Sequence, residues 1–412
     1  MATPLCARIP SGGGAASLAE YRLAGGYLGL AAARELGSAA ITEAVRKAGL
    51  RGRGGAGFST AMKWAALPQP DGGPRYLVVN ADEKEPGTMK DRFLMEGDPH
   101  QLVEGAAIAA LATGARTGYI YLRREYSRCA IELAKALAEA EGAGLLDGLE
   151  LHLHLGAGRY LCGEETGLLN AIEGKRATPR NKPPFPQISG LWGRPTVVNN
   201  VETLCNLPHI LREGPDWYKA LSSSRDGGTK IYGASGWVAR PGVWELPLGA
   251  TAGEILERAG GMAPGRTARA FLPGGASTDF LPAAKLDVKM DFDSVAAAGS
   301  RLGTGTMVLL DDGTCPVGMV LALERFFARE SCVWCTPCRE GLPWVRRCLE
   351  ALEEGSGEMS DIEALEYHAK ALAPGRTFCA FAPGAMEPLD SALKLFRDDF
   401  VDHVTRKGCR WR

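Results

Sequence analysis

Four cysteines carry the clearest chemical signal in the sequence. Cys332, Cys335 and Cys338 are each separated by two residues, and Cys379 follows after a further helical stretch. Three thiolates on one loop with a remote fourth form the ligand pattern of an iron–sulfur cluster, here of the 4Fe-4S type. A structural zinc site is the main alternative, although zinc usually takes its ligands as two pairs. The spacing therefore predicts an iron–sulfur cluster, with zinc and unliganded structural thiols as the other possibilities.

The other seven of the eleven cysteines show no comparable grouping. Free cysteine is commonly a small buried apolar residue, so we expect these thiols to fill the core. Cys162 is the exception, because it lies inside a glycine turn and is expected close to a cofactor without being redox-active. The remaining positions considered are Cys129 and Cys348 on helices, Cys205 in an apolar stretch, and Cys6 and Cys409 near the chain ends.

A glycine loop that includes Gly52, Gly54 and Gly57 matches the letters of the dinucleotide-binding fingerprint. That fingerprint requires a preceding strand, whereas residues 41–50 have helical spacing, so a standard Rossmann loop is excluded. Glycines still expose backbone N–H groups and allow a phosphate or a ring to approach closely. The loop predicts either a cofactor site or a plain tight turn. Lys63, further along, is either a point charge for a phosphate or an ordinary surface lysine.

Five carboxylates accompany the two glycine turns, which is unusual for a site that binds only phosphates. They are Asp82, Glu83 and Glu85 after a predicted strand, and Glu164 and Glu165 after the second glycine turn. Carboxylates suit ribose hydroxyls and an amide such as that of nicotinamide, and they repel a 2′-phosphate. The alternative is that acids at helix N-termini only offset the helix dipole.

The elements that must position these residues alternate between strand and helix, which is typical of an α/β domain. Strands are expected at residues 76–79, 118–122 and 149–155, with helices at 99–113 and 128–140. The first strand is an unbroken apolar run followed by a polar loop, as expected for a buried parallel strand. Polar groups at such a strand end usually face a ligand.

Four segments are predicted along the chain. Residues 1–40 form a weakly ordered lead-in, and residues 41–222 form the Rossmann-like α/β domain. Residues 223–312 form a small β-grasp domain with a helix whose capping box begins at Thr251. Residues 313–412 form a helical domain that carries the cluster cysteines. Its helices are expected near residues 319–329, 342–353, 361–372 and 389–404.

The composition argues against nucleic acid or a membrane as a direct partner. The 412 residues include 47 basic and 48 acidic side chains, so no overall field favours a polyanion. Apolar runs such as residues 106–112 are far shorter than the roughly 20 residues that cross a bilayer. Residues 1–10 lack the pattern of a secretory signal, so we expect a cytoplasmic protein.

Six separated motifs occur in an order that resembles a known family. They are Gly-Arg-Gly-Gly-Ala-Gly-Phe58, Asn80-Ala-Asp-Glu83, Cys162-Gly-Glu-Glu165, Lys182-Pro-Pro-Phe185, Asn199-Asn200-Val-Glu-Thr203 and the cysteine set. Together they resemble the flavin-bearing NADH-dehydrogenase subunit of bacterial respiratory complex I, and the likeness covers residues 20–404. Segments 330–344 and 377–388 are most similar to proteobacterial members of that family.

The resemblance implies a set of cofactor contacts. Around FMN it places Gly52, Arg53, Gly54, Gly55, Gly57, Lys63, Asn80, Asp82, Gly163, Glu164, Asn199, Asn200 and Thr203, and Glu83 is counted in the same cofactor-binding set. NADH would contact Phe58, Lys63, Glu85, Glu165, Lys182 and Phe185. The phenyl rings of Phe58 and Phe185 offer stacking surfaces for its bases. The 4Fe-4S cluster would be held by Cys332, Cys335, Cys338 and Cys379. No side chain is expected to act as a catalytic acid or base.

The implied function is NADH oxidation with FMN, followed by single-electron transfer to the cluster and onward to quinone. Flavin is required because NADH gives up a hydride, whereas a cluster accepts one electron at a time. The implied partners are a thioredoxin-like 2Fe-2S subunit and the large iron–sulfur subunit of complex I. Membrane contact would come only through that complex, at the inner face of the plasma membrane.

Two alternatives remain open. A diaphorase subunit of a soluble NAD-linked hydrogenase or formate dehydrogenase shares these motifs, although such subunits often carry extra terminal domains that this sequence does not show. A non-catalytic scaffold module is the second alternative, and the intact motifs argue against it. Departures from the family pattern are Ala66 in place of a larger residue, Lys84 in place of a neutral one, and a short N-terminal region poor in charge.

Overall fold

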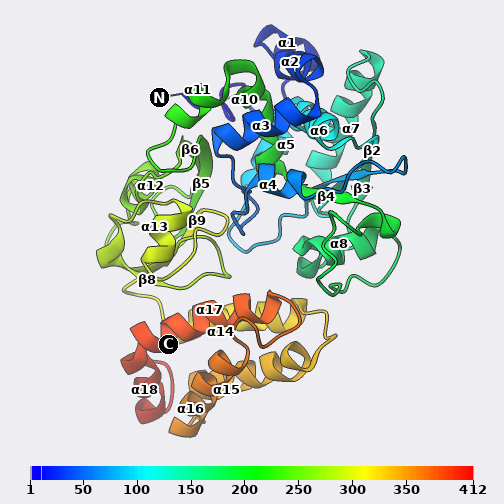
Figure 1. The fold of residues 1–412 in the computed structure, drawn as a ribbon. Helices are drawn as coiled ribbons and strands as arrows, with labels where there is room; N and C mark the ends of the chain where they lie inside the picture. The colour runs from blue at the N-terminus through cyan, green and yellow to red at the C-terminus, as the bar shows by residue number, and fades with distance from the viewer. Residues whose placement is uncertain (1, 11, 412) are drawn as a thin grey trace. The chain divides into compact units, whose positions relative to one another are not determined.

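Four parallel strands form the sheet of the N-terminal α/β unit (Figure 1). In the computed structural model, which describes residues 2–10 and 12–411, their order is β3-β2-β1-β4. The strands are β1 (Tyr76–Ala81), β2 (Thr117–Leu122), β3 (Glu150–Leu155) and β4 (Thr196–Asn200). The chain adds β2 and β3 on one side of β1 and then returns to add β4 on the other. The order therefore reverses between β1 and β4, where open α/β sheets bind ligands at the carboxyl ends of their strands.

The helices of this unit confirm the predicted alternation of strand and helix. They are α1 (Leu18–Leu23), α2 (Leu28–Leu36), α3 (Ser38–Ala48), α4 (Thr60–Ala65), α5 (Lys90–Gly97), α6 (Pro99–Thr113), α7 (Ser127–Gly142), α8 (Glu165–Ile172), α9 (Val201–Cys205), α10 (Leu207–Glu213) and α11 (Pro215–Ala220), with short 3-10 turns at Tyr160–Gly163 and Leu191–Gly193. Helix α6 begins at Pro99 and ends before Gly114, whose φ of 71° suits a left-handed helix end. A Cβ on Gly105 would lie 2.2 Å from the Leu204 carbonyl oxygen, so glycine allows α6 to pack closely against α9.

The prediction of a weakly ordered lead-in at residues 1–40 is wrong. Helices α1 and α2 lie there, and α1 begins with a capping box between Ser17 and Glu20. A buried carboxylate on α6 anchors this region, because Glu104 accepts hydrogen bonds from the Tyr21 hydroxyl at 2.5 Å and the Leu30 N–H at 2.9 Å. The anchor is a distant polar side chain, so the sparse apolar periodicity of the segment gave no sign of it.

The chain forms two compact units. The first contains Met1–Lys84, Met89–Ile231 and Glu245–Ala250, and the second contains Glu85–Thr88, Tyr232–Trp244 and Thr251–Arg412. No helix in the described part of the chain is long and apolar enough to cross a membrane.

A second sheet has the strand order β6-β5-β9-β7-β8. Its strands are β5 (Thr229–Gly236), β6 (Gly242–Pro247), β7 (Ala268–Leu272), β8 (Leu281–Pro282) and β9 (Thr306–Asp311), accompanied by helices α12 (Ala252–Arg258) and α13 (Phe292–Ala297) and a 3-10 turn at Ala283–Lys285. Strand β9 pairs in parallel with β5 and antiparallel with β7. The predicted capping box of α12 is confirmed, because the Thr251 hydroxyl accepts a hydrogen bond from the Glu254 N–H at 3.1 Å.

The C-terminal region is helical, as predicted, with one correction. Its helices are α14 (Pro316–Glu330), α15 (Leu342–Glu354), α16 (Met359–Ala371), α17 (Phe381–Leu395) and α18 (Arg397–Arg406), and a π-helical turn covers Pro337–Gly341. The single helix predicted at residues 389–404 is two helices, because the backbone breaks at Phe396 with φ of −123° and ψ of 28°. Asp398 and Asp399 then lie in the first turn of α18, where acids offset the helix dipole.

Candidate functional site

The reversal of strand order brings together polar residues from separate sequence motifs. Asn80 at the end of β1 is paired with Asn200 at the end of β4, and Val79 is paired with Asn199. The Asn80 side chain donates a hydrogen bond to the Gly163 carbonyl at 3.0 Å, which attaches the second glycine turn to the same sheet edge. We call this edge the switch-point site; it contains Asn80, Gly163, Asn199 and Asn200.

The glycine loop after α3 joins the switch-point site through its backbone. The Arg53 N–H donates a hydrogen bond to the Thr203 hydroxyl at 2.8 Å. A Cβ on Gly54 would lie 3.1 Å from the Asn200 Cβ, so the loop backbone passes close to that side chain. The Arg53 guanidinium is buried and donates to the carbonyls of Gly227 and Thr229 at 3.0 and 3.2 Å. Arg53 thus uses its side chain to anchor the loop. The Gly52 N–H donates to the Phe58 carbonyl at 2.8 Å, so the later glycines of the loop are the candidates for contacts with a ligand.

Four charged side chains form a chain of ion pairs beside the loop. Lys63 Nζ lies 2.9 Å from Glu165 Oε2, and Lys182 Nζ lies 3.0 Å from Glu165 Oε1 and 2.9 Å from Glu164 Oε1. Burial raises the pKa of Glu165, but the Lys63 and Lys182 ammonium groups outweigh it and hold that pKa below its usual range. Lys63 also donates to the Val198 carbonyl at 3.1 Å. The sequence left Lys63 as a phosphate contact or a surface lysine, and the structure shows it partly buried and paired.

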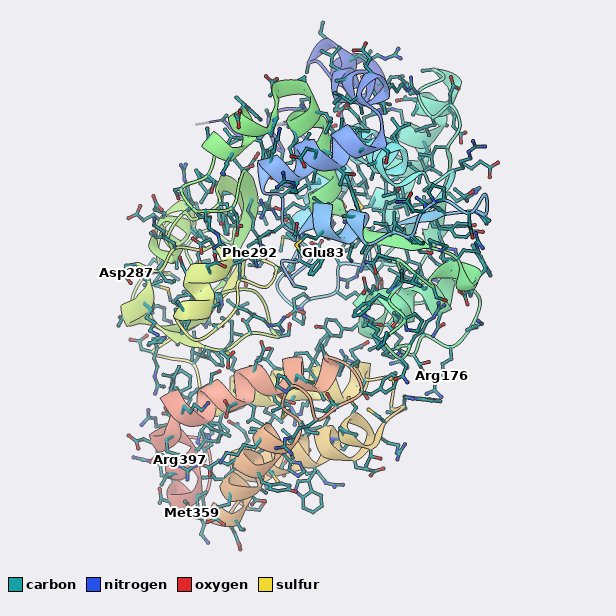
Figure 2. All side chains as sticks on the ribbon, in the orientation of Figure 1. Glu83, Arg176, Asp287, Phe292, Met359 and Arg397 are labelled. Carbon is teal, nitrogen blue, oxygen red and sulfur yellow. The ribbon has the colours of Figure 1, made fainter. Side chains whose placement is uncertain are left out.

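Two of the predicted acids cap helices. Glu164 Oε2 accepts hydrogen bonds from the N–H groups of Thr166 and Gly167 at 2.9 and 2.8 Å, which caps α8. Glu83, labelled in Figure 2, accepts from the N–H groups of Asp91 and Arg92 at 2.8 and 3.0 Å, at the start of α5. For these two residues the helix-capping alternative describes the contacts in the structure.

Asp82 has a different environment from its neighbour Glu83. Both of its carboxylate oxygens are buried, and neither accepts a hydrogen bond from a residue that the structure describes. Burial raises the pKa of Asp82 to about 7, although Lys84 Nζ lies 3.5 Å from Oδ1 and opposes the rise. A buried carboxylate without a donor is costly unless a ligand supplies one. Lys84 is also close to Glu125, since its Nζ lies 3.7 Å from Glu125 Oε2. The charge of Lys84 thus faces both carboxylates.

A buried ionic group beneath Asn200 was not predicted. Glu202 Oε2 lies 3.0 Å from both Lys90 Nζ and Lys230 Nζ, and these side chains are at most 1% exposed. Burial raises the pKa of Glu202, but the two ammonium groups outweigh it and lower that pKa to about 2. Asp91 belongs to the same group, because its Oδ1 lies 2.6 Å from Lys90 Nζ. Asp91 also accepts a hydrogen bond from the Asn200 side chain at 2.6 Å, so the ionic group orients a predicted site residue. No local pattern joins these residues, because they lie far apart in the sequence.

Asn199 also has a partner that sequence reasoning missed. The Trp64 indole N–H donates to Asn199 Oδ1 at 3.0 Å. The only sign of Trp64 in the sequence was its position next to Lys63, on the first helix after the glycine loop. Of the residues predicted to contact NADH, Phe58 and Phe185 are each 53% exposed and therefore open to a stacking partner. Glu85 belongs to the second compact unit, where it accepts a hydrogen bond from the Ser277 N–H at 2.6 Å.

Cys162 lies in the core rather than on an open surface. It is fully buried in a cluster with Val78, Tyr121 and Leu168. Burial raises the pKa of its thiol, which keeps sulfur in the unreactive neutral form. Cys129, Cys205 and Cys348 are buried as expected for core thiols.

The four cysteines predicted to bind the cluster all lie in the second unit. Burial raises the pKa of the Cys338 thiol, and the neighbouring thiols of Cys335, Cys379 and Cys332 raise it further. Val333 in the same loop has φ of 52°, a left-handed conformation that a β-branched residue rarely adopts. Such backbone strain is often found where a ligand or a metal constrains a loop. The donor set suits an iron–sulfur cluster.

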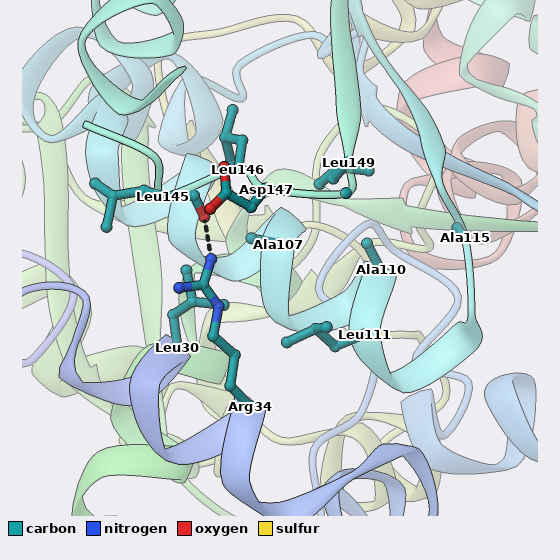
Figure 3. Close-up of a pocket in the computed structure, with 11 residues that line it drawn as sticks. Leu30, Arg34, Ala107, Ala110, Leu111, Ala115, Leu145, Leu146, Asp147 and Leu149 are labelled. Carbon is teal, nitrogen blue, oxygen red and sulfur yellow. Dashed lines mark hydrogen bonds between the residues drawn. The ribbon is translucent and has the colours of Figure 1, made fainter. Parts of the chain in front are cut away.

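One hollow on the first unit is a poor match for a nucleotide (Figure 3). Its volume is about 40 Å³, and it contains none of the predicted site residues. Ligand pockets are usually several hundred Å³ in volume. Arg34 at its mouth donates a hydrogen bond to the Leu145 carbonyl at 2.8 Å, as the dashed line in Figure 3 shows.

Two family models match the regions that hold these features. Residues 45–209 match the Nuo51 FMN-binding domain, and residues 318–403 match the NADH-ubiquinone oxidoreductase-F iron-sulfur binding region. The F subunits of NADH-quinone oxidoreductase from Salmonella typhimurium and Escherichia coli K12 are each 56% identical over 394 residues, which is 93% of this chain and 88% of theirs. The corresponding protein of Streptomyces coelicolor is 46% identical over 95% of this chain and 89% of its own.

A solved structure of an NAD+-reducing NiFe hydrogenase in the H2-reduced state is also similar. It superimposes with a TM-score of 0.84 at 37% identity. The match covers 90% of this chain and 64% of the hydrogenase chain.

Proposed function

The chain belongs to the family of NADH-quinone oxidoreductase F subunits, and we propose that the switch-point site is where it binds FMN and oxidises NADH. The chain is an NADH dehydrogenase that uses FMN and a 4Fe-4S cluster. The observation that carries the proposal is the convergence of the glycine loop, Asn80, Asp82 and Asn200 on one sheet edge, within the matched FMN-binding region.

The residues at this edge fit FMN. Its hydroxyl-rich chain can donate hydrogen bonds to the buried Asp82 oxygens, which accept none from the described residues. Its phosphate suits the backbone N–H groups of the glycine loop other than that of Gly52, which donates to the Phe58 carbonyl. When bound, FMN takes two electrons from NADH as a hydride and passes them on singly to a 4Fe-4S cluster. The role of the chain's own residues is to orient the ligands and exclude water.

Glu165 and Lys182 are the residues that we propose for the ribose end of NADH. The Glu165 carboxylate is held ionised by two lysines, and an ionised carboxylate is a strong acceptor for ribose hydroxyls. The exposed rings of Phe58 and Phe185 offer stacking surfaces. Each of these residues remains a prediction about the bound state.

Cys332, Cys335, Cys338 and Cys379 are the proposed cluster ligands. Four thiolates are the standard ligand set of a 4Fe-4S cluster, and all four lie within the matched iron–sulfur region. A zinc ion at the same thiols is the alternative, and the iron content of the purified protein separates the two.

The wider organisation is also a proposal. We infer a β-grasp module at residues 223–312, since strands β5 to β9 form a mixed sheet with α12 beside them in sequence. The predicted division at residues 41, 223 and 313 stays a prediction. The 2Fe-2S and large iron–sulfur subunits of complex I are the proposed partners, with membrane contact through them at the inner face of the plasma membrane.

The test is the visible spectrum of the purified full-length protein. We expect flavin bands above a broad iron–sulfur absorption, and bleaching of both when NADH is added without oxygen. A colourless protein, or a flavin that NADH does not reduce, would refute the proposal. A diaphorase role is the second candidate, favoured by the similarity to the hydrogenase chain. Purification with hydrogenase subunits rather than quinone-reductase subunits would support it.

A further inference from the structure

A second group of potential metal ligands lies in the C-terminal unit, apart from the four cluster cysteines. Ligand atoms of Cys315, Glu353, His403 and Cys409 all lie within 4.8 Å of one another. Cys315 and Cys409 fall outside the matched iron–sulfur region, which covers residues 318–403. The sequence spacing of these two cysteines gave no sign that they meet in the folded chain.

The distances suit four ligands around one small cation. Cys315 Sγ lies 3.2 Å from Glu353 Oε1 and 3.4 Å from His403 Nε2, and the latter two atoms are 3.3 Å apart. Bond lengths of about 2.0–2.3 Å in a tetrahedral zinc site place ligand atoms about 3.3–3.8 Å apart. The separations are therefore close to those of a zinc site, with only small adjustments required.

His403 is oriented as a metal ligand. Its Nδ1 lies 2.6 Å from the Asp399 carbonyl, and because a carbonyl can only accept, Nδ1 must donate its hydrogen. In the neutral ring the lone pair is then on Nε2, which faces Cys315 and Glu353. Metal-bound histidines are commonly fixed in this way by a backbone carbonyl. The ring is 1% exposed, so water does not compete for that lone pair.

The group is crowded with potential negative charge. Two thiol sulfurs and the Glu353 carboxylate offer ligand atoms within 4.8 Å of one another. Cys315 also caps α14, since its sulfur accepts a hydrogen bond from the Gly318 N–H at 3.2 Å, a position that favours a thiolate. A divalent cation resolves this conflict, because it binds both thiolates and the carboxylate and displaces the two thiol protons to solvent.

Contacts of the C-terminal segment hold Cys409 in place. The Gly408 N–H donates to the His403 carbonyl at 2.9 Å, and the Arg410 guanidinium pairs with Asp399 at 3.0 Å. The Trp411 ring stacks on the His403 ring, with centroids 6.2 Å apart. The segment is thus held on both sides of Cys409. The position of Cys409 close to Cys315 is therefore set by the fold.

We propose that Cys315, Glu353, His403 and Cys409 bind one structural zinc ion. Two sulfurs, an imidazole and a carboxylate around a tetrahedral centre are a zinc donor set. All four ligands come from the protein, so no position is left open for a substrate, and the ion is structural rather than catalytic. It joins the N-terminus of α14, the end of α15, helix α18 and the C-terminal segment.

The test is metal analysis of the full-length protein with its flavin and cluster bound. We expect one zinc ion per chain in addition to the cluster iron. X-ray absorption at the zinc edge should show two sulfur and two nitrogen or oxygen neighbours. A shell of sulfur alone would mean that zinc occupies the cluster cysteines, and would overturn the proposal. An absence of zinc from protein produced with zinc supplied would overturn it as well.

Variants separate the two cysteine sites. Cys409→Ser and His403→Gln should each lower zinc content at least tenfold while iron stays unchanged. Cys348→Ser is the matched control, because Cys348 is a buried thiol of the same unit that lies outside the group, and serine can keep its contact with Asp361. If Cys409→Ser retained its zinc, the ligand set would be wrong. A Cys315–Cys409 disulfide found by mass spectrometry of unreduced peptides would also refute the proposal.

Discussion

Nucleotide choice can be tested at Glu165, which is held between two lysines. We expect Glu165→Gln to raise the ratio of kcat/KM for NADPH to that for NADH. Lys63, Lys182, Glu164 and Glu165 together carry two positive and two negative charges, so the substitution leaves the group with a net charge of +1. A 2′-phosphate with a charge of about −2 would then be attracted by the group, which is neutral overall in the parent protein.

The size of the effect follows from distance and exposure. Unit charges about 5 Å apart interact by about 3 kcal/mol at an effective dielectric constant of about 20. The four side chains are between 20% and 29% exposed, so solvent and salt screen part of this energy. A remaining shift of roughly 1.5–3 kcal/mol corresponds to a ratio change of about 10- to 100-fold.

The assay is steady-state reduction of ferricyanide, which bypasses the partner subunits. Glu173→Gln is the matched control, since Glu173 also pairs with two cations, Lys175 and Arg180, at the far end of α8. Flavin content and thermal midpoint should match those of the parent protein. If the ratio changed less than twofold, or changed equally in the control, selectivity would come from shape or from another carboxylate. The effect should also shrink as salt is added.

Three further predictions concern the interior and the cluster. Glu202→Gln should lower the free energy of unfolding by roughly 3–5 kcal/mol, because it leaves Lys90 and Lys230 buried without their shared anion. Since the pKa of Glu202 is lowered to about 2, its contribution to the free energy of unfolding is present above about pH 4.5 and is lost as pH falls towards 2. Urea unfolding across this pH range should show that the loss is absent in the variant. Cys379→Ser should remove or convert the cluster while FMN stays bound, and unchanged iron content with an unchanged paramagnetic spectrum would contradict the assignment. Burial raises the pKa of Glu324 well above its usual value, and its carboxylate accepts no hydrogen bond from the described residues, so Glu324→Gln should stabilise the protein by about 1–3 kcal/mol near pH 8. Because a raised pKa favours the protonated folded state, that gain should disappear below about pH 4.5, and equal gains at both pH values would refute the explanation.

Local patterns predicted the elements that depend on local forces. The bounds of α6 and the capping box at Thr251 were predicted correctly. Proline, glycine and cap residues affect only the backbone within a few residues of their own position, so a local pattern suffices. The apolar run of β1 was correct for the same reason, since a buried parallel strand must be apolar on both faces. The carboxyl end of that strand then indicated the ligand edge.

The features that the sequence did not predict share a different cause. The helices of the N-terminal region depend on Glu104, and the orientation of Asn200 depends on Asp91, so each relies on a polar partner distant in sequence. Cys315 and Cys409 meet only after helices have packed, and their spacing along the chain contains no ligand motif. Such contacts are set by tertiary structure, which a single sequence read by period and spacing does not reveal.

Two pairs of adjacent acids, one after β1 and one at the second glycine turn, each combine a structural role with a proposed ligand contact. In each pair one carboxylate accepts two backbone N–H groups at a helix start: Glu83 does so at α5 and Glu164 at α8. The other member does not cap. Asp82 has no hydrogen-bond donor among the described residues, and Glu165 faces two lysines. The hydrogen bonds of the capping acid fix the local backbone. Because the second acid is adjacent in sequence, the same hydrogen bonds also fix the position of its Cα. Helix capping and the proposed ligand contact are therefore complementary roles in each pair, and a substitution at the capping acid should disturb both.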